Sequence, residues 1–474
     1  MEVQQIRKQL EEMIRENQDR PVSMQQIRQK LQLNDPAQLQ ALEEAIRQLT
    51  EEYIAAISQK GNLISARMAG YEEGTITVNR KGFGFLDLES GESIHLSEAN
   101  LHGAMNGDWV VVRRRPSSYG NQEGEVVRIR EHRTTHVIGT FVASAGKSLV
   151  LKLDDERIHT AVRVLNQREY KLVSGMKAQL QIVRYADPLQ LKIVRLLGHA
   201  DDPGVDVLSI LLEYDIDPQF PDEVMEQAQK MPTRVCARDK AGRRDLTAET
   251  IITIDGEDSK DLDDAVSVEK TEEGYRLGVH IADVSYYVRE GSPLDREALK
   301  RGTSTYVVDR VVPMLPHLLS NGICSLNPKV IRLTLSCVME LDEQGRVREA
   351  ELFPSFIRTT ERMTYTAVNA ILDGDETVRR RYRKIVPMIE LMAQCAQGIR
   401  RRRHDQGAIN FEKEEARILL DEHGRIRDIK PRERREAERM IEDFMVCANE
   451  AVARHMKQLE FPCLFRIHEA PEAE

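Results

Sequence analysis

The 474-residue sequence has no long apolar run, few cysteines and few aromatic residues. Because no stretch of about 18 consecutive apolar residues occurs, we expect no membrane-spanning helix. The N-terminal residues 1–5 are polar, so we expect no signal peptide. The six cysteines are scattered without a Cys-x-x-Cys pair, so neither a zinc site nor a disulfide framework is predicted. These absences favour a cytoplasmic protein without membrane contact.

The length and composition predict about three or four domains, and 41% hydrophobic residues are enough to build sizeable cores. The net charge is −10 and the pI is about 5.8, which argues against non-specific binding to nucleic acid. That argument fails if the negative charge is concentrated in one place and neutralised by a cation.

Residues 1–68 are predicted to form a winged helix-turn-helix. Ser23 and Gln26 form a capping-box pair, and Asp35 followed by Pro36 marks a second helix start. Two short apolar segments around residues 60–62 then suggest a hairpin. The functional interpretation is contact with nucleic acid. The alternative is a small docking domain, because the segment is rich in Glu and Gln and has no basic face.

Residues 70–131 are predicted to form an OB-fold barrel. Residues 80–86 read Arg-Lys-Gly-Phe-Gly-Phe-Leu, which resembles the first RNA-binding motif of cold-shock domains. Phe83 and Phe85 are two residues apart on a strand and so face the same side. We expect both rings to stack on bases, Lys81 to hold phosphate and the glycines to let bases approach. The alternative is that the rings are core aromatics of an ordinary barrel.

Residues 137–197 repeat the strand pattern without the aromatic motif and are predicted to form a second OB-like barrel. From residue 205 to residue 474 strands and helices alternate, which indicates a mixed α/β catalytic domain. One long helix is expected from Val378 to about Arg403, with nine basic residues and one acid. It is a candidate phosphate track, or alternatively a solvated charged face.

The segment Asp245–Glu273 concentrates the negative charge, with eleven acidic residues and two lysines. Asp255 follows an apolar β-branched run and is expected at a strand end, and Asp261, Asp263 and Asp264 follow a short loop. Carboxylates at this density either stay solvated or gather around a cation. Hard oxygen ligands suit Mg²⁺ or Mn²⁺ rather than zinc. The spacing does not fit an EF-hand, because Val266 stands where that loop needs glycine.

A long, ordered set of motifs resembles the ribonuclease II (RNB) family. The motifs are Asp245-Leu-Thr247, Thr253-Ile-Asp255, Asp261-Leu-Asp-Asp-Ala265, His280-Ile-Ala-Asp283, Val312-Pro-Met-Leu-Pro316, Cys324-Ser-Leu326, Gly407-Ala-Ile-Asn-Phe411 and Leu464-Phe-Arg-Ile-His468. The order of a helix-turn-helix, two cold-shock barrels and an RNB domain is similar to that of the bacterial ribonuclease R branch. The expected fold class is therefore multidomain α+β.

The resemblance implies a processive exoribonuclease that hydrolyses RNA from its 3′ end and releases nucleoside 5′-monophosphates. It implies Asp255, Asp261 and Asp263 as Mg²⁺ ligands and Asp264 as the essential acidic partner of the metal and the scissile phosphate. It places Tyr306 where the family has an aromatic that stacks on the terminal base, although a strand-packing tyrosine is the alternative. It also suggests Phe411 as a second base clamp. The expected partner is the 3′ end of single-stranded RNA, with structured RNA as a further candidate.

The sequence departs from the family pattern at its C-terminal side, because no Ser-Pro-Ile-Arg-Arg-Tyr motif and no third barrel follow His468. We therefore expect an incomplete RNB domain, with weak or no activity in these 474 residues alone. Two alternatives stay open. One is a non-catalytic RNA-binding or RNA-chaperone protein that acts through its barrels, and the other is an RNB relative that has lost catalysis.

Overall fold

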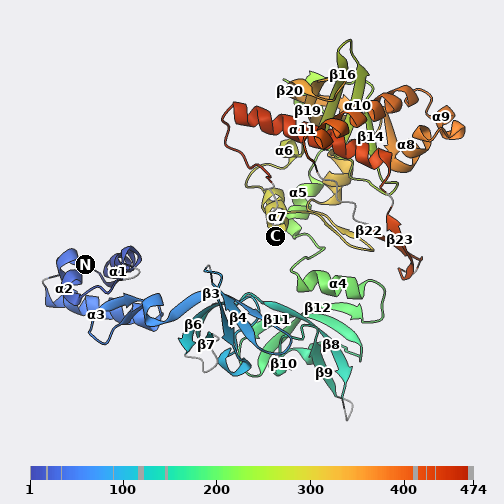
Figure 1. Ribbon diagram of the computed structural model, residues 1–474. Helices are drawn as coiled ribbons and strands as arrows, with labels where there is room; N and C mark the ends of the chain where they lie inside the picture. The colour runs from blue at the N-terminus through green and yellow to red at the C-terminus, as the bar shows by residue number, and fades with distance from the viewer. Residues whose placement is uncertain are drawn as a thin grey trace. The chain divides into compact units, whose positions relative to one another are not determined.

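The computed structural model describes residues 2–17, 20–33, 35–88, 90–115, 122–144, 148–408, 415–422, 424–432 and 434–467. The chain divides into two compact units, Met1–Asp215 and Ile216–Glu474 (Figure 1). Each unit has its own hydrophobic clusters. In the described part of the chain, no helix is both long enough and apolar enough to cross a membrane.

The first unit begins with three helices and a two-stranded hairpin: α1 (Val3–Glu16), α2 (Met24–Leu31), α3 (Pro36–Glu51), β1 (Ala55–Ile57) and β2 (Leu63–Ser65). The capping box between Ser23 and Gln26 is present at the start of α2, and Asp35 caps α3 with Pro36 in its first turn. Helix α1 was not expected as a separate element, although Ile6 and Leu10 recur on its buried face. The winged helix-turn-helix remains a prediction.

A closed five-stranded barrel follows, in the order β3-β4-β5-β7-β6. Its strands are β3 (Tyr71–Val78), β4 (Gly84–Asp87), β5 (Ser93–Leu96), β6 (Trp109–Arg115) and β7 (Glu123–Glu131). Alternate residues such as Ile76, Leu86 and Ile94 fill the interior and are fully buried, as the two-residue period of a strand requires.

The next segment forms a five-stranded sheet in the order β10-β12-β11-β8-β9. In the described residues this sheet has β9 and β10 as its edges and is not a closed ring. Its strands are β8 (His136–Ala143), β9 (Leu149–Leu153), β10 (Val162–Val164), β11 (Met176–Arg184) and β12 (Leu189–His199), and α4 (Val205–Glu213) follows them. Phe141, Leu180 and Leu191 lie fully buried at its core.

The second unit is built on a seven-stranded mixed sheet in the order β13-β20-β19-β16-β15-β14-β21. The strands are β13 (Arg244–Asp245), β14 (Ile252–Asp255), β15 (Asp264–Lys270), β16 (Gly274–Ala282), β19 (Ile331–Asp342), β20 (Val347–Arg358) and β21 (Glu361–Thr364). Two hairpins, β17 (Thr305–Tyr306) with β18 (Val311–Val312) and β22 (Glu415–Leu420) with β23 (Ile426–Arg432), stand outside this sheet.

One face of the sheet packs under helices α8 (Tyr365–Leu372), α10 (Val386–Asp405) and α11 (Glu436–Gln458), and α10 and α11 lie across the strands in Figure 1. Ile252, Val266 and Leu277 of the sheet meet Ile389 of α10 and Phe444 of α11 in one buried cluster. On the opposite face, here called the polar face, Thr334, Ser336 and Ser355 are hydrogen-bonded to one another. The side covered by the helices is the dry side, and the polar face combines these hydroxyls with a smaller apolar cluster around Ala265, Ala282 and Ile357.

The single long basic helix expected from Val378 is wrong. The chain forms α9 (Glu376–Arg381), leaves helical geometry, and starts again at α10 with Pro387 in its first turn. Four of the arginines are used in ion pairs: Arg379 with Glu390, Arg400 with Glu436 and Asp443, Arg402 with Glu450, and Arg403 with Asp443. These contacts fasten α10 to α9 and α11, so a continuous phosphate track is not supported.

Candidate functional site

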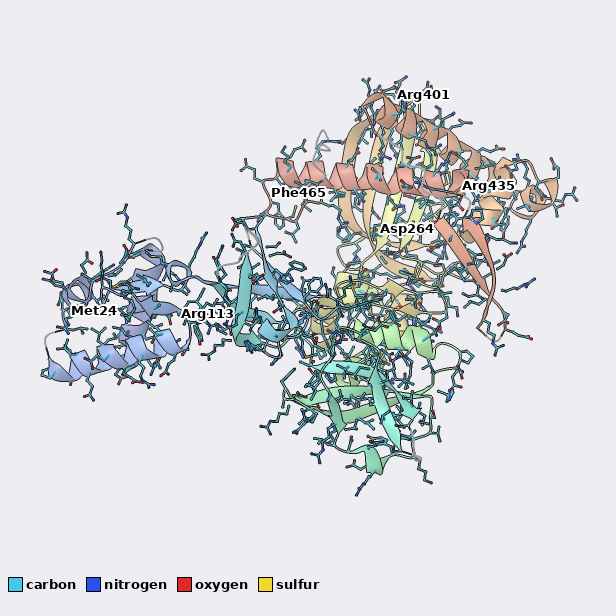
Figure 2. All side chains as sticks on the ribbon, turned by 60° about the horizontal axis from the view of Figure 1, so that its bottom comes forward. Met24, Arg113, Asp264, Arg401, Arg435 and Phe465 are labelled. Carbon is cyan, nitrogen blue, oxygen red and sulfur yellow. The ribbon has the colours of Figure 1, made fainter. Side chains whose placement is uncertain are left out.

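The acidic loop connects β14 to β15 and carries the four aspartates that the sequence singles out. Strand β14 ends at Asp255, as the sequence predicts, and β15 begins at Asp264. Figure 2 marks Asp264 in the second unit. The backbone between them is held in place because Ala282 N donates to Asp263 O at 2.9 Å. The strand ends and the loop thus bring Asp255, Asp261, Asp263 and Asp264 into one neighbourhood.

Ser259 stands between two of these carboxylates. Its Oγ is 2.8 Å from Asp255 Oδ2 and 3.2 Å from Asp261 Oδ1. A hydroxyl has one proton to donate, so it can serve only one of the two carboxylates at a time. The oxygen of the other carboxylate then lacks a hydrogen bond from Ser259.

Burial and neighbouring carboxylates raise the pKa of Asp263 and Asp264. Burial, followed by the charges of Asp263 and Asp255, raises the pKa of Asp264 to about 7. Burial of the carboxyl group, followed by the charges of Asp261 and Asp255, also raises the pKa of Asp263, although the residue as a whole is exposed. Asp264 Oδ2 is buried without a hydrogen-bond partner among the described residues. Acids whose ionised forms are disfavoured in this way favour any cation that can take the place of the bound protons.

Two residues remote in sequence anchor the acidic loop. Arg362 on β21 donates from Nη2 to the carbonyls of Gly256, Glu257 and Ser259 at 3.3, 2.8 and 2.8 Å. On the other side, Ser325 Oγ donates to Lys260 O at 2.8 Å and accepts from Leu262 N at 3.2 Å. Sequence reasoning included Ser325 in a motif without a role and missed Arg362, because no local pattern connects either residue to the loop.

Tyr306 lies at the edge of this site. Its side chain is 68% exposed, and its hydroxyl donates to Asp261 Oδ2 over a long 3.4 Å. Burial and the charge of Asp261 raise the pKa of this phenol. Tyr306 also lines a cavity of about 910 Å³, together with Ser259, Tyr365, Asn369 and Lys430. An exposed ring at the mouth of a cavity can accept a flat ligand on its face.

The donor set fits a hard divalent cation, although it is not assembled as a finished cage. Among the described residues, no three His, Cys, Asp or Glu side chains already converge closely enough to hold a metal ion. However, the unpartnered Asp264 Oδ2 and the raised pKa values of Asp263 and Asp264 indicate a site that is short of positive charge. Carboxylate oxygens are the ligands preferred by Mg²⁺ and Mn²⁺.

The barrel of the first unit presents a separate aromatic platform, made of Phe83 just before β4, Phe85 on β4 and His95 on β5. The ring centroids lie 5.6 Å apart for the two phenylalanines, and 5.3 and 5.5 Å from His95. The two phenylalanine rings are half-buried and lie outside the barrel core, so their interpretation as core aromatics is wrong. His95 was missed because it lies on the next strand.

The glycines and arginines of this barrel have structural roles. Gly82 has a φ of +86° in a turn, and a Cβ on Gly84 would press against Thr77 O and Ile76 inside the barrel. These glycines thus serve the turn and the interior. Arg113 and Arg115 both pair with Glu125. Lys81 is exposed, and Phe411 lies outside the described residues.

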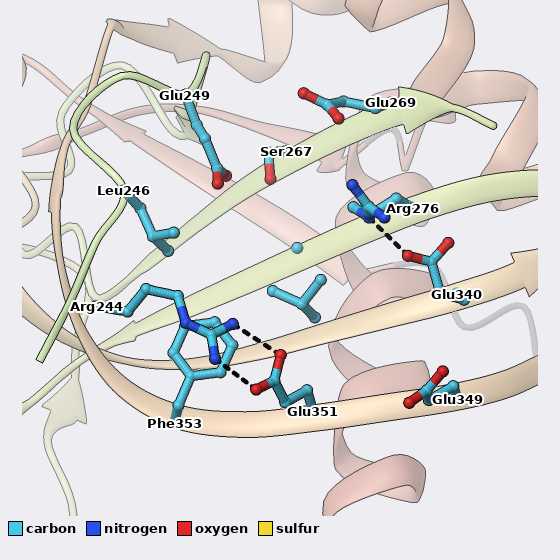
Figure 3. Close-up of a pocket in the computed structure, with 12 residues that line it drawn as sticks. Arg244, Leu246, Glu249, Ser267, Glu269, Arg276, Glu340, Glu349, Glu351 and Phe353 are labelled. Carbon is cyan, nitrogen blue, oxygen red and sulfur yellow. Dashed lines mark hydrogen bonds and ion pairs between the residues drawn. The ribbon is translucent and has the colours of Figure 1, made fainter.

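A second hollow of about 340 Å³ lies on the polar face of the seven-stranded sheet (Figure 3). Arg244 stacks over the Phe353 ring and pairs with Glu351, and Arg276 pairs with Glu340. The charged groups that line this hollow are spread over an open sheet face around Gly278. None of its described acids is buried without a hydrogen-bond partner. The acidic loop is therefore the better candidate for chemistry.

Comparison with known proteins identifies the family of the chain. The RNB domain model matches residues 243–474, the ribonuclease B OB domain model matches residues 74–129, and the cold shock domain model matches residues 151–221. Ribonuclease R of Thermotoga maritima is 38% identical over 478 residues, which cover 99% of this chain and 67% of that protein.

The chain belongs to the RNB family.

Another relative, ribonuclease R 1 of Lactococcus lactis, is 38% identical over 495 residues, which cover 99% of this chain and 60% of that protein. The chain thus spans only part of the length of these relatives. Ribonuclease R of Mycoplasma genitalium, solved with ribose-methylated single-stranded RNA, superposes with a TM-score of 0.76 at 30% identity, covering 82% of this chain and 62% of that one. The same protein solved with double-stranded RNA gives 0.66 at 29% identity, covering 76% and 61%.

Proposed function

We propose that the chain carries the metal-binding centre of an exoribonuclease that hydrolyses single-stranded RNA from its 3′ end and releases nucleoside 5′-monophosphates. The observation that carries the proposal is the acidic loop: four neighbouring aspartates with raised pKa values for Asp263 and Asp264 and an unpartnered Asp264 Oδ2. Membership of the RNB family supports it, and the relative solved with single-stranded RNA indicates the substrate class.

In this proposal Asp255, Asp261, Asp263 and Asp264 hold Mg²⁺ or Mn²⁺. Bound there, the cation would neutralise phosphate charge and activate the attacking water. Before the cation binds, the raised pKa lets Asp264 keep a proton near neutral pH, which limits repulsion within the loop. Asp264 would lose that proton when the four carboxylates hold a cation, which would leave all four charged.

The other residues of the site position the RNA. The exposed ring of Tyr306 lies within hydrogen-bond reach of Asp261, so a base stacked on this ring would end next to the carboxylates. The cavity beside it is lined by Lys430 and Tyr365, which supply a positive charge and an aromatic face for the following nucleotides. The platform of Phe83, Phe85 and His95 in the first unit offers a further place for single-stranded bases.

The test is a gel assay of this chain on 5′-labelled RNA with Mg²⁺ or Mn²⁺, run in parallel with Asp264→Asn. We expect the substitution to lower hydrolysis by about 100-fold or more, the order that removal of one electrostatic stabiliser costs, while RNA binding is retained. Asp222→Asn is the matched control, because Asp222 is exposed in the first turn of α5 (Asp222–Gln229).

The outcomes separate the two candidate functions. The sequence predicts weak or no hydrolysis by these 474 residues alone, and any hydrolysis that disappears in Asp264→Asn supports the proposed centre. If neither protein shortens RNA, the two functions are separated by adding Mn²⁺ without RNA: binding of Mn²⁺ by the unsubstituted chain supports the metal centre, and RNA binding without Mn²⁺ binding favours the RNA-binding alternative. Hydrolysis that survives in Asp264→Asn would refute the proposed centre.

A further inference from the structure

We propose that Arg362 is a positioning residue that sets the spacing between Asp255 and Asp261 and thereby the affinity of the acidic loop for its cation. The inference rests on the proposed function, and it assigns a role to a residue that contacts neither the cation nor the RNA in that proposal. Its observations are the contacts of Arg362 with the loop backbone and the contacts of Ser259 with the two carboxylates.

Arg362 reaches the loop from the neighbouring strand. Strands β14 and β21 run parallel, with Thr253 opposite Arg362 and Asp255 opposite Thr364. From this position Nη2 of Arg362 donates to three carbonyl oxygens of the loop backbone, those of Gly256, Glu257 and Ser259. A single nitrogen carries two hydrogens, so one hydrogen is shared between two carbonyls, and the three oxygens are drawn toward one point.

The chemistry of this contact requires a cationic donor. Three carbonyl oxygens that point at one place repel one another, and a guanidinium offsets that repulsion with its permanent positive charge. The guanidinium is thus turned to the carbonyls and leaves the carboxylates of the loop free for a ligand. Because Gly256 N also donates to Asp255 Oδ1 at 2.7 Å, the loop backbone orients this carboxylate directly.

The link from Arg362 to the carboxylates runs through Ser259. Arg362 holds Ser259 by its carbonyl, and Ser259 Oγ lies between Asp255 Oδ2 and Asp261 Oδ1. Ser325 fixes the next residues of the loop at Lys260 and Leu262. With both anchors in place, the Ser259 hydroxyl stays within hydrogen-bond distance of both aspartates, and residues that orient metal ligands in this way affect metal affinity.

The test measures Mn²⁺ binding by the whole chain with electron paramagnetic resonance, without RNA, and follows folding by circular dichroism. We expect Arg362→Gln to raise the dissociation constant for Mn²⁺ by about 10- to 100-fold, the usual effect of losing a residue that orients metal ligands. Arg362→Lys keeps the charge with one compact donor and should lose less. Ser259→Ala should weaken binding in the same direction. Combined with Arg362→Gln, its effect should be less than additive, because both act through one chain of contacts.

The matched control is Arg358→Gln. Arg358 also donates to one backbone carbonyl, that of Thr247 at 3.3 Å, but does not touch the acidic loop. We expect its Mn²⁺ affinity to equal that of the unsubstituted chain. A purely stabilising role for Arg362 would lower the melting temperature and leave the affinity of the folded protein unchanged, and that result would overturn the inference. If Arg362→Gln does not fold, Ser259→Ala decides in the same way. Failure of the unsubstituted chain to bind Mn²⁺ would instead overturn the proposed metal centre and the inference with it.

Discussion

His280 is the most completely enclosed titratable side chain on the polar face of the sheet. It is 0% exposed, with Nδ1 at 2.7 Å from Ser336 Oγ and Nε2 at 3.3 Å from Ser267 Oγ. Burial lowers its pKa to about 4. A Cβ on the neighbouring Gly278 would collide with both Ser267 Oγ and the imidazole, so glycine at this position makes room for the ring. The imidazole is therefore held neutral by its surroundings.

This enclosure predicts a pH dependence of stability. Unfolded His280 titrates near its ordinary pKa of about 6.5, whereas the folded group stays neutral until about pH 4. As the pH falls between these values the unfolded state gains a proton that the folded state does not, so the free energy of unfolding decreases, by up to about 3 kcal/mol. Urea titrations at about pH 7 and about pH 4.5 measure it.

His280→Asn is the comparison, because asparagine can donate and accept hydrogen bonds but does not titrate. The variant should lose less stability than the unsubstituted chain over the same pH interval, whatever its stability at neutral pH. An equal loss in both proteins would contradict the assignment of the pH dependence to His280.

At this scale the sequence identified the acids but not the residues that organise them. The density of carboxylates between Asp245 and Glu273 is visible in a linear reading. The contacts of Ser325 and Arg362 with the loop join residues about 60 to 100 positions apart, and such pairs follow from strand order rather than from local pattern. Ser259 lies within this acidic segment, and its position between Asp255 and Asp261 was the signal in the sequence that could have predicted its contacts with them.

At the scale of elements, the hairpin of β4 and β5 carries the aromatic platform to which we assign RNA binding. Replacing Phe83 or Phe85 with alanine should weaken binding of single-stranded RNA by about 1–3 kcal/mol for each stacked base that is lost. Because the two rings contact each other at 5.6 Å, the double substitution should cost less than the sum of the single ones. Fluorescence anisotropy with a labelled oligonucleotide measures both effects.

Tyr214→Ala provides the control for this element, since Tyr214 is an aromatic of the same unit that is 73% exposed and lies outside the barrel. Its affinity for RNA should equal that of the unsubstituted chain. If the platform variants also bind RNA normally, the barrel does not use these rings, and the resemblance to a cold-shock motif is then only structural.

The elements that the sequence predicted well are those with local signals. The capping residues of α2 and α3 and the alternation of β4 are present as expected. The break between α9 and α10 was missed, although Pro387 is a typical signal of a helix start. The open order of the sheet from β8 to β12 could not be predicted, because closure of a barrel depends on pairing between distant strands.

At the scale of the whole molecule, the two units have separate cores and should unfold separately. The segment between them includes the exposed Tyr214. We expect brief treatment with chymotrypsin to cut near residue 214 first and to leave two resistant fragments. Differential scanning calorimetry should show two transitions, one for each fragment. Only the fragment that contains the acidic loop should gain stability from Mn²⁺. A single transition that Mn²⁺ shifts as a whole would contradict this division.

The buried cluster beneath α10 and α11 has a consequence for the order in which the protein folds as it is synthesised. The cluster joins Ile252 of β14 to Phe444 and Ala451 of α11, so the part of the dry side that α11 covers stays exposed until the ribosome has added almost 200 further residues. At about 5–20 residues per second that delay lasts on the order of ten seconds or more. During it the nascent strands expose apolar surface that chaperones can bind, while the first unit already has all the residues of its own cores.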